Sequence, residues 1–304
     1  MSESLVRQLV SWLADGPVIV ASVVDARGAT PRKRHSHMLI RISDEPSATF
    51  ESVGGGEAES RVIDAARRLL QEGAASSRVR IDLDGSAGAA GICGGHMDIL
   101  LHRWAGDSDL RCAEALAARL RAGEAVSLHR DAEADGAAHC RVDPDDRLLI
   151  IGGGHCGLAL HQMARHLDFD LCVFDERVDF ANADRFPDTL CLHGTFDMLQ
   201  QALDTPRRVL AVLLSRDFAT DLGALQQLAA RPPAFIGMMG SRRRIHQVRT
   251  ALVERLGDRA AQDLERVHAP IGLDIGAHTP HEIAISVLAE LIAWRHASAQ
   301  APPA

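Results

Sequence analysis

Hydrophobic positions in the first half of the chain follow two patterns, one typical of helices and one typical of strands. Residues 1–15 place Leu5, Leu9 and Leu13 on one side, which predicts an amphipathic helix. A run rich in β-branched residues at residues 17–24 predicts a buried strand. Further strands are expected at residues 38–42, 78–83, 97–102 and 125–130, and further helices at residues 57–71 and 109–122. The first half is therefore predicted to be an α+β domain.

The second half alternates short apolar runs with helical patterns, which is the order that builds a parallel sheet with helices on both faces. Strands are expected at residues 147–151, 169–174, 189–192, 208–214 and 234–238, and helices at residues 157–167, 198–203, 219–230, 242–256 and 280–296. Residues 131–146 are acidic and polar and include Pro144, so they are the predicted boundary. The patterns predict an α/β protein with domains at 1–145 and 146–304, the second a Rossmann-like doubly wound parallel sheet.

Composition narrows the possible classes of function. The 304 residues are 46% hydrophobic and 24% charged, which suits a globular protein with two cores. A net charge of −8 without a basic stripe argues against nucleic acid as a partner. No run is long enough to span a membrane and no signal peptide is visible, so we expect no membrane association and a cytoplasmic location. The six cysteines have no paired spacing and are expected to stay reduced.

A glycine-rich loop follows the first strand of the second half. Gly152, Gly154 and Gly157 fit G-x-G-x-x-G, and His155 lies within the loop. Such a loop allows a tight turn, close approach of a phosphate to the backbone, and binding by N–H groups at a helix N-terminus. Asp175 closes the next strand, where an acidic residue that meets a ribose belongs. An empty turn, or one that binds a different phosphate, is the alternative, because a fold alone does not fix a function.

Two glycine turns in the first half could also approach a ligand closely. One leads into a helix whose first turn contains Glu59, and the other begins at Cys93. The glycines of these turns are Gly54, Gly55, Gly56, Gly94 and Gly95. A plain strand-to-helix turn explains the first equally well, since glycine needs no further reason there. For Cys93, the alternative is a small buried hydrophobic residue.

Residues 29–37 concentrate positive charge within an acidic protein. The guanidinium group of Arg32 suits a phosphate or a pterin tail, although a solvated turn would have the same composition. His35 and His37 alternate as on a strand, and with His96 they resemble part of a metal site. No carboxylate or cysteine completes that set at a reliable spacing, so a metal site is not predicted from these histidines.

Together these motifs resemble the XdhC/CoxI family, the accessory proteins of molybdenum hydroxylases, over nearly the whole chain. The segments that carry the resemblance are, in family order, residues 29–32, 52–59, 93–95, 151–157, 235–243, 268–276 and 280–284. The last two are the most specific. The chain departs from the family pattern at Ser215-Arg216-Asp217, at Gly91-Ile92-Cys93 and at His35-Ser36-His37.

The resemblance implies an N-terminal XdhC/CoxI-like domain before the Rossmann-like one, and a function as a chaperone rather than an enzyme. Such a protein would bind the molybdenum cofactor (molybdopterin) as cargo, protect it during sulfuration and deliver it to a client such as xanthine dehydrogenase. Cys93 would contact the metal. The implied cofactor-binding residues are Pro31, Arg32, Gly54, Gly55, Gly56, Glu59, Cys93, Gly94, Gly95, Gly152, Gly154, His155, Gly157, Asp175, Gly240, Ser241, Arg242 and Asp274.

Other partners and functions are considered beside this one. A cysteine desulfurase could be a second partner, and a homodimer is expected because it is the commonest oligomer. From the residues themselves, an NAD(P)-dependent oxidoreductase could use the glycine loop and Asp175. An interaction protein whose Rossmann fold binds neither cofactor nor nucleotide is a third interpretation.

Overall fold

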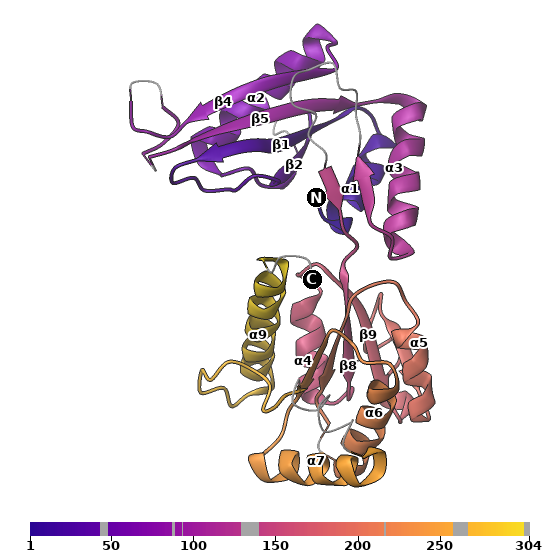
Figure 1. Ribbon diagram of the computed structural model, residues 1–304. Coiled ribbons are helices and arrows are strands. Elements are labelled where there is room, and N and C mark those ends of the chain that lie inside the picture. The colour runs from indigo at the N-terminus through magenta and orange to yellow at the C-terminus, as the bar shows by residue number, and fades with distance from the viewer. Residues whose placement is uncertain are drawn as a thin grey trace. The chain divides into compact units, whose positions relative to one another are not determined.

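The computed structural model divides the chain into two compact units, Met1–Pro144 and Asp145–Ala304 (Figure 1). The structure describes residues 1–42, 48–86, 89–92, 94–128, 140–215, 217–257 and 267–300, so Cys93 lies outside the described residues. Each hydrophobic cluster among them lies wholly within one unit. In this part of the chain, no helix combines the length and the apolar character needed to cross a lipid bilayer.

A five-stranded antiparallel sheet organises the N-terminal unit, with the strand order β3-β2-β1-β5-β4. Its strands are β1 Val18–Arg27, β2 His37–Arg41, β3 Ala48–Glu51, β4 Ser76–Asp82 and β5 His96–Trp104. The register of β1 against β5 shifts between Val23 and Asp25, as in a β-bulge. Val23 lies in the core, and the shift places Asp25 opposite Asp98 instead of in that core.

Helices cover both faces of this sheet. Helix α2, Gly56–Glu72, packs its alanine, valine and leucine side chains onto Ile19, Ala21 and Val23 of β1. Helices α1, Glu3–Leu13, and α3, Gly106–Arg121, cover the face to which Val18 and Val20 point. The alternation along β1 thus supplies two cores from one strand. A separate two-stranded sheet pairs β6, Val126–Leu128, with β7, Cys140–Val142.

The C-terminal unit contains a six-stranded parallel sheet in the order β10-β9-β8-β11-β12-β13. Its strands are β8 Asp146–Ile151, β9 Phe169–Asp175, β10 Leu190–His193, β11 Val209–Leu213, β12 Phe235–Met238 and β13 Val267–His268. Numbered within the unit, this order is 3-2-1-4-5-6, that of a Rossmann fold. The order reverses beside β8, so β9 and β11 flank it. The predicted Rossmann-like doubly wound sheet is confirmed.

Helices lie on both faces of the parallel sheet (Figure 1). Helices α4, His155–Ala164, and α9, Pro280–Gln300, pack on one face. The opposite face is covered by α5 Leu199–Leu203, α6 Phe218–Ala230 and α7 Arg242–Leu256. Two 3-10 turns, Val178–Phe180 and Phe196–Met198, lie in the connections. Because both faces are covered, a central strand such as β8 is apolar at consecutive positions.

Candidate functional site

A cavity of about 540 Å³ lies in the C-terminal unit, at the carboxyl ends of β8, β9 and β11. Three short segments line it: Gly152, Gly154, His155 and Cys156 after β8; Phe174, Asp175, Glu176, Arg177 and Phe180 at the end of β9; and Leu214, Ser215, Asp217 and Thr220 after β11. Open α/β sheets bind their ligands at this place, because the crossovers on either side of the strand-order reversal leave a crevice there.

The glycines of the loop after β8 have different structural requirements. Gly152 has φ +110°, which favours glycine, and a Cβ on Gly157 would lie 2.0 Å from the carbonyl oxygen of Gly152. These two positions therefore form the turn itself. Gly154 is the N-cap of α4, and a Cβ there would meet no atom within 4 Å. Gly154 thus leaves the backbone at the start of α4 open towards the cavity, which is where an anion would bind.

Asp175 also lines the cavity, but its carboxylate is already engaged. One oxygen accepts hydrogen bonds from the backbone N–H of Arg177 at 3.1 Å and from its Nε at 2.9 Å. The other accepts from the backbone N–H of Gly153 and from Nη2 of Arg177, both at 3.0 Å. Burial opposes ionisation, yet these hydrogen bonds outweigh it and hold the pKa of Asp175 below its ordinary value. Asp175 therefore fixes the glycine loop to the end of β9.

Arg177 and Phe180 form the edge of the cavity beside Asp175. The guanidinium carbon of Arg177 lies 3.6 Å from the centre of the Phe180 ring, a cation–π contact. Arg185 lies 5.3 Å from the same ring and donates to the carbonyl oxygen of Gly153 at 3.0 Å. Through this hydrogen bond to Gly153, the segment after β9 holds the glycine loop in place. Arg177 was not predicted from the sequence, although its position two residues after Asp175 was an available signal.

The wall after β11 is held by a buried network. Ser215 Oγ donates to Asp221 at 2.6 Å, and Arg244 Nη2 lies 2.9 Å from the other oxygen of Asp221. The same nitrogen donates to the carbonyl oxygens of Ser215 and Met239, each at 2.8 Å. Burial raises the pKa of Asp221, although Ser215 and Arg244 oppose this. Three elements, the end of β11, α6 and α7, are joined here.

Besides Gly157, four residues of the C-terminal unit that the resemblance assigned to cofactor binding lie outside the lining of this cavity. Ser241 caps α7, where its hydroxyl accepts from the N–H of Arg244, and Gly240 lies against the Arg244 side chain. These two act on the cavity wall only through Arg244. Arg242 and Asp274 are exposed on the C-terminal unit, and neither lines the cavity.

The turns predicted as ligand contacts in the N-terminal unit lie side by side. A Cβ on Gly95 would lie 2.3 Å from the carbonyl oxygen of Arg27, and one on Gly54 would lie 3.0 Å from the Pro31 side chain. Gly94 donates to the carbonyl oxygen of Leu83 at 2.7 Å. The structure therefore brings together the turn at residues 29–32, the glycine turn before α2 and the two glycines before β5.

Glu59 builds one of these turns. Its carboxylate accepts hydrogen bonds from Ser52 Oγ at 2.5 Å, from the N–H of Val53 at 3.2 Å and from the N–H of Gly55 at 2.9 Å. Burial opposes ionisation, but these hydrogen bonds prevail and lower the pKa of Glu59. With its carboxylate used in this way, Glu59 shapes the turn. A Cβ added to Gly55 or to Gly56 would meet no atom within 4 Å, so the backbone is open at these two positions.

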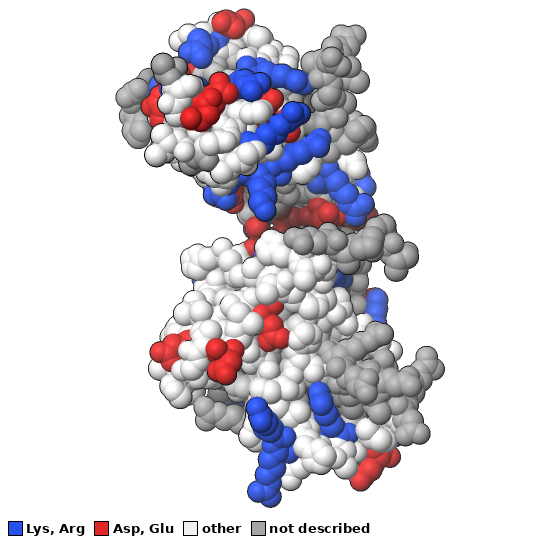
Figure 2. All heavy atoms as spheres, turned by 60° about the vertical axis from the view of Figure 1, so that its left-hand side comes forward, with Lys and Arg blue, Asp and Glu red and all other residues white. Residues whose placement is uncertain are grey.

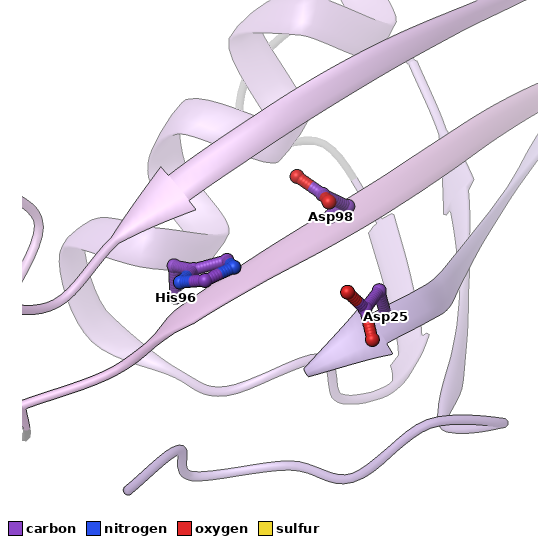
Figure 3. A group of neighbouring side chains, drawn as sticks. All are labelled: Asp25, His96 and Asp98. Carbon is purple, nitrogen blue, oxygen red and sulfur yellow. The ribbon is translucent and has the colours of Figure 1, made fainter. Parts of the chain in front are cut away.

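The charged surface of the N-terminal unit includes a group that could hold a metal ion. Figure 2 shows Lys and Arg side chains gathered on one face of this unit, with acidic side chains beside some of them. His96 lies with Asp25 and Asp98 on the neighbouring strands β1 and β5, their ligand atoms all within 4.8 Å of one another (Figure 3). Arg27 forms an ion pair with Asp25 at 2.9 Å and so already balances one of the two carboxylates.

His37 does not join this group. It pairs with Ser22 along β1, whereas His96 pairs with Arg27, near the other end of the strand. The combination of His35, His37 and His96 considered from the sequence is therefore not formed. The aspartates beside His96 were not found from the sequence, because Asp25 reaches Asp98 only through the bulge in β1.

Two family models match the chain. Residues 11–82 match the model of the XdhC and CoxI family, and residues 148–291 match the model described as the XdhC Rossmann domain. The second match contains the whole lining of the cavity.

Three curated relatives are similar in sequence. An uncharacterised Escherichia coli protein, YqeB, is 31% identical over 281 residues, covering 91% of this chain and 43% of its own length. A Bacillus subtilis protein, described as a probable xanthine dehydrogenase component, is 28% identical over 157 residues, 51% of this chain and 44% of its length. The molybdenum cofactor insertion chaperone PaoD of Escherichia coli is 25% identical over 96% of this chain and 88% of its own. The chain thus spans less than half the length of two of these relatives.

One solved structure has the same fold over the whole chain. A Bacillus halodurans protein, described as a xanthine dehydrogenase, has a TM-score of 0.81 with 23% identical residues. The match covers 99% of this chain and 98% of that one. At this level of identity the likeness supports the fold alone.

Proposed function

Because the chain belongs to the XdhC and CoxI family, we propose that it is an accessory protein that binds the molybdenum cofactor as cargo. In this proposal it protects the cofactor during sulfuration and delivers it to a molybdenum hydroxylase such as xanthine dehydrogenase. The similarity to the insertion chaperone PaoD over 96% of the chain supports this function. A cysteine desulfurase as second partner and a homodimer stay predictions from the sequence.

The observation that carries the proposal is the open backbone of Gly154 at the start of α4, inside a cavity of about 540 Å³. N–H groups at a helix N-terminus bind phosphate, and molybdopterin ends in a phosphate group. The carboxylates of Asp175 and Asp217 are engaged in hydrogen bonds that hold the cavity walls. Such an arrangement favours binding and release of a ligand over proton transfer to it.

The N-terminal unit contains further candidate cofactor-binding residues in this proposal. Arg32, Gly55 and Gly56 supply charge and open backbone for an anionic part of the cofactor. Cys93, outside the described residues, supplies a thiolate, which is a ligand suited to a soft metal centre. Replacing Cys93 by alanine would then weaken the retention of the cofactor's metal.

The experiment compares Gly154→Val with Ala105→Val. Both residues are helix N-caps in extended backbone without a side-chain cap, and Ala105 lies in the N-terminal unit, before α3. Valine at position 154 fills the start of the cavity, so we expect the purified variant to retain at least about tenfold less molybdopterin than the wild type. The Ala105→Val variant should retain as much as the wild type. Retention is measured by the fluorescence of the oxidised pterin released from the protein.

The NAD(P)-dependent alternative gives the opposite results. Wild-type protein that retains no molybdopterin, yet binds NADH or NADPH saturably and turns it over with a substrate, would replace the chaperone proposal by an oxidoreductase. Equal pterin retention by wild type and Gly154→Val would remove the glycine loop from the cofactor site.

A further inference from the structure

The carboxylate of Asp175 has no capacity left for a ribose. Each of its two oxygens already accepts two N–H groups, and a carboxylate oxygen has two lone pairs. A ribose that binds at this position of a Rossmann fold donates its hydroxyl groups to the acidic residue at the end of the second strand. Here such a ribose would first have to displace the Arg177 side chain, which is held by both Asp175 and Phe180.

Arg177, although ion-paired to Asp175, presents unused N–H donors to the cavity in place of that acceptor. Its side chain is 61% exposed and lines the cavity, while its stacking on Phe180 and its two bonds to Asp175 fix the plane of the guanidinium group. Nε and Nη2 are used in those bonds, and Nη1 has no hydrogen-bond partner among the described residues. A fixed guanidinium group with free N–H donors is a phosphate-binding group.

The acidic side chains that contact Thr220 direct an anion towards Arg177. Thr220 Oγ1 lies 2.9 Å from Glu176 and 3.1 Å from Asp217, so two carboxylates share one hydroxyl group on that side. Both acidic residues line the cavity. A phosphate is repelled there and attracted to the region between Arg177 and the start of α4.

We propose that Arg177 determines the specificity of this cavity, which binds a phosphate monoester next to Asp175 and excludes an unphosphorylated ribose diol. The inference deepens the proposed function and rests on it, because it names the chemical group through which the ligand binds in the cavity. Two kinds of molecule carry this group: a nucleotide with a phosphate on its ribose, and a pterin with a terminal phosphate.

The test measures the affinities of matched pairs of probes for the full chain. The nucleotide pair is NADP⁺ and NAD⁺, of which only NADP⁺ carries a phosphate monoester, and the pterin pair is the stable oxidised derivative of molybdopterin before and after phosphatase treatment. The variants are Arg177→Gln and, as a control, Arg231→Gln, whose side chain is 50% exposed and ion-paired to Asp204 at 3.1 Å outside the cavity. Dissociation constants are measured by isothermal titration calorimetry.

In at least one pair, we expect wild type and Arg231→Gln to prefer the phosphorylated member by about tenfold. Arg177→Gln should lose this preference, and NAD⁺ should bind to this variant more tightly than to the wild type because Asp175 is released. No preference in either pair, or a preference that survives in Arg177→Gln, overturns the inference. Its failure is distinct from that of the proposed function, since retention of molybdopterin by the purified protein is measured without these probes.

Discussion

His37 gives the N-terminal unit a response to acid. Its side chain is 8% exposed, and Nδ1 lies 2.9 Å from Ser22 Oγ. Burial lowers the pKa of His37 from 6.5 to about 3. Between these two values the unfolded chain binds a proton that the folded chain does not. The free energy of unfolding is therefore unaffected by this group above pH 6.5 and decreases as the pH falls towards 3.

Replacing His37 by glutamine should remove this part of the acid sensitivity. From pH 7 to pH 5, we expect the wild type to lose on the order of 1–2 kcal/mol more stability than the variant. Urea denaturation at the two pH values, followed by circular dichroism, measures the difference. His281→Gln, at an exposed position on α9, should behave like the wild type. An equal loss in wild type and His37→Gln would contradict the assignment.

Polar and charged residues at the candidate sites could be located from the sequence more easily than the contacts that their side chains make. The glycine motifs, Glu59 and Asp175 were all singled out, and Glu59 and Asp175 do lie at their turns. Their carboxylates, however, are used by backbone N–H groups and by Arg177, and a sequence pattern does not show which donors fold back onto an acid. Asp217 and Ser215 reach the cavity because β11 lies beside β8, a pairing between strands far apart in the chain.

At the scale of elements, apolar runs predicted the central strands, whereas some short strands were not predicted. Three were missed: β3, β7 and β13. β3 and β13 are edge strands, and β7 lies in a two-stranded sheet. Such strands are short and need few buried side chains, so they leave little apolar signal. Helix α4 begins at His155, two residues before the predicted start, because Gly154 caps it within the loop.

The network around Asp221 joins the end of β11, α6 and α7, and substitutions can test how much its ion pair contributes to stability. Asp221 is fully buried, and its ion pair with Arg244 is 2.9 Å long. Arg244→Met leaves a buried carboxylate without its cation, so we expect a loss of about 3–5 kcal/mol in the free energy of unfolding. Adding Asp221→Leu removes the unpaired charge and should recover most of that loss. Urea denaturation of both variants measures this, and a double variant less stable than the single one would contradict the explanation.

At the scale of the whole molecule, the two units have separate cores. The clusters on the two faces of the parallel sheet consist of residues between Leu148 and Leu291, and no residue of the N-terminal unit belongs to them. The complete lining of the cavity also lies within this span. The determinants of the Rossmann fold and of its ligand cavity are thus contained in the second half of the chain.

A fragment of residues 145–304 should therefore fold by itself. We expect a cooperative thermal unfolding transition and the same preference between phosphorylated and unphosphorylated probes as in the full chain, because both sheet faces are covered by helices of the same unit. Circular dichroism and calorimetry measure these properties. A fragment without cooperative unfolding would show that the first half supplies stability to the second.

The β-bulge near the end of β1 determines which face of the sheet the last residues of that strand point to. Val23 faces the hydrophobic layer, and one additional backbone unit decides that the carboxylate of Asp25 faces water. A regular strand that kept Val24 would place Asp25 opposite Met97, within the hydrophobic layer, whereas removal of Val24 would leave Asp25 opposite Asp98. A chain without Val24 should thus keep the rest of β1 in its present register with β5, in a strand without the bulge.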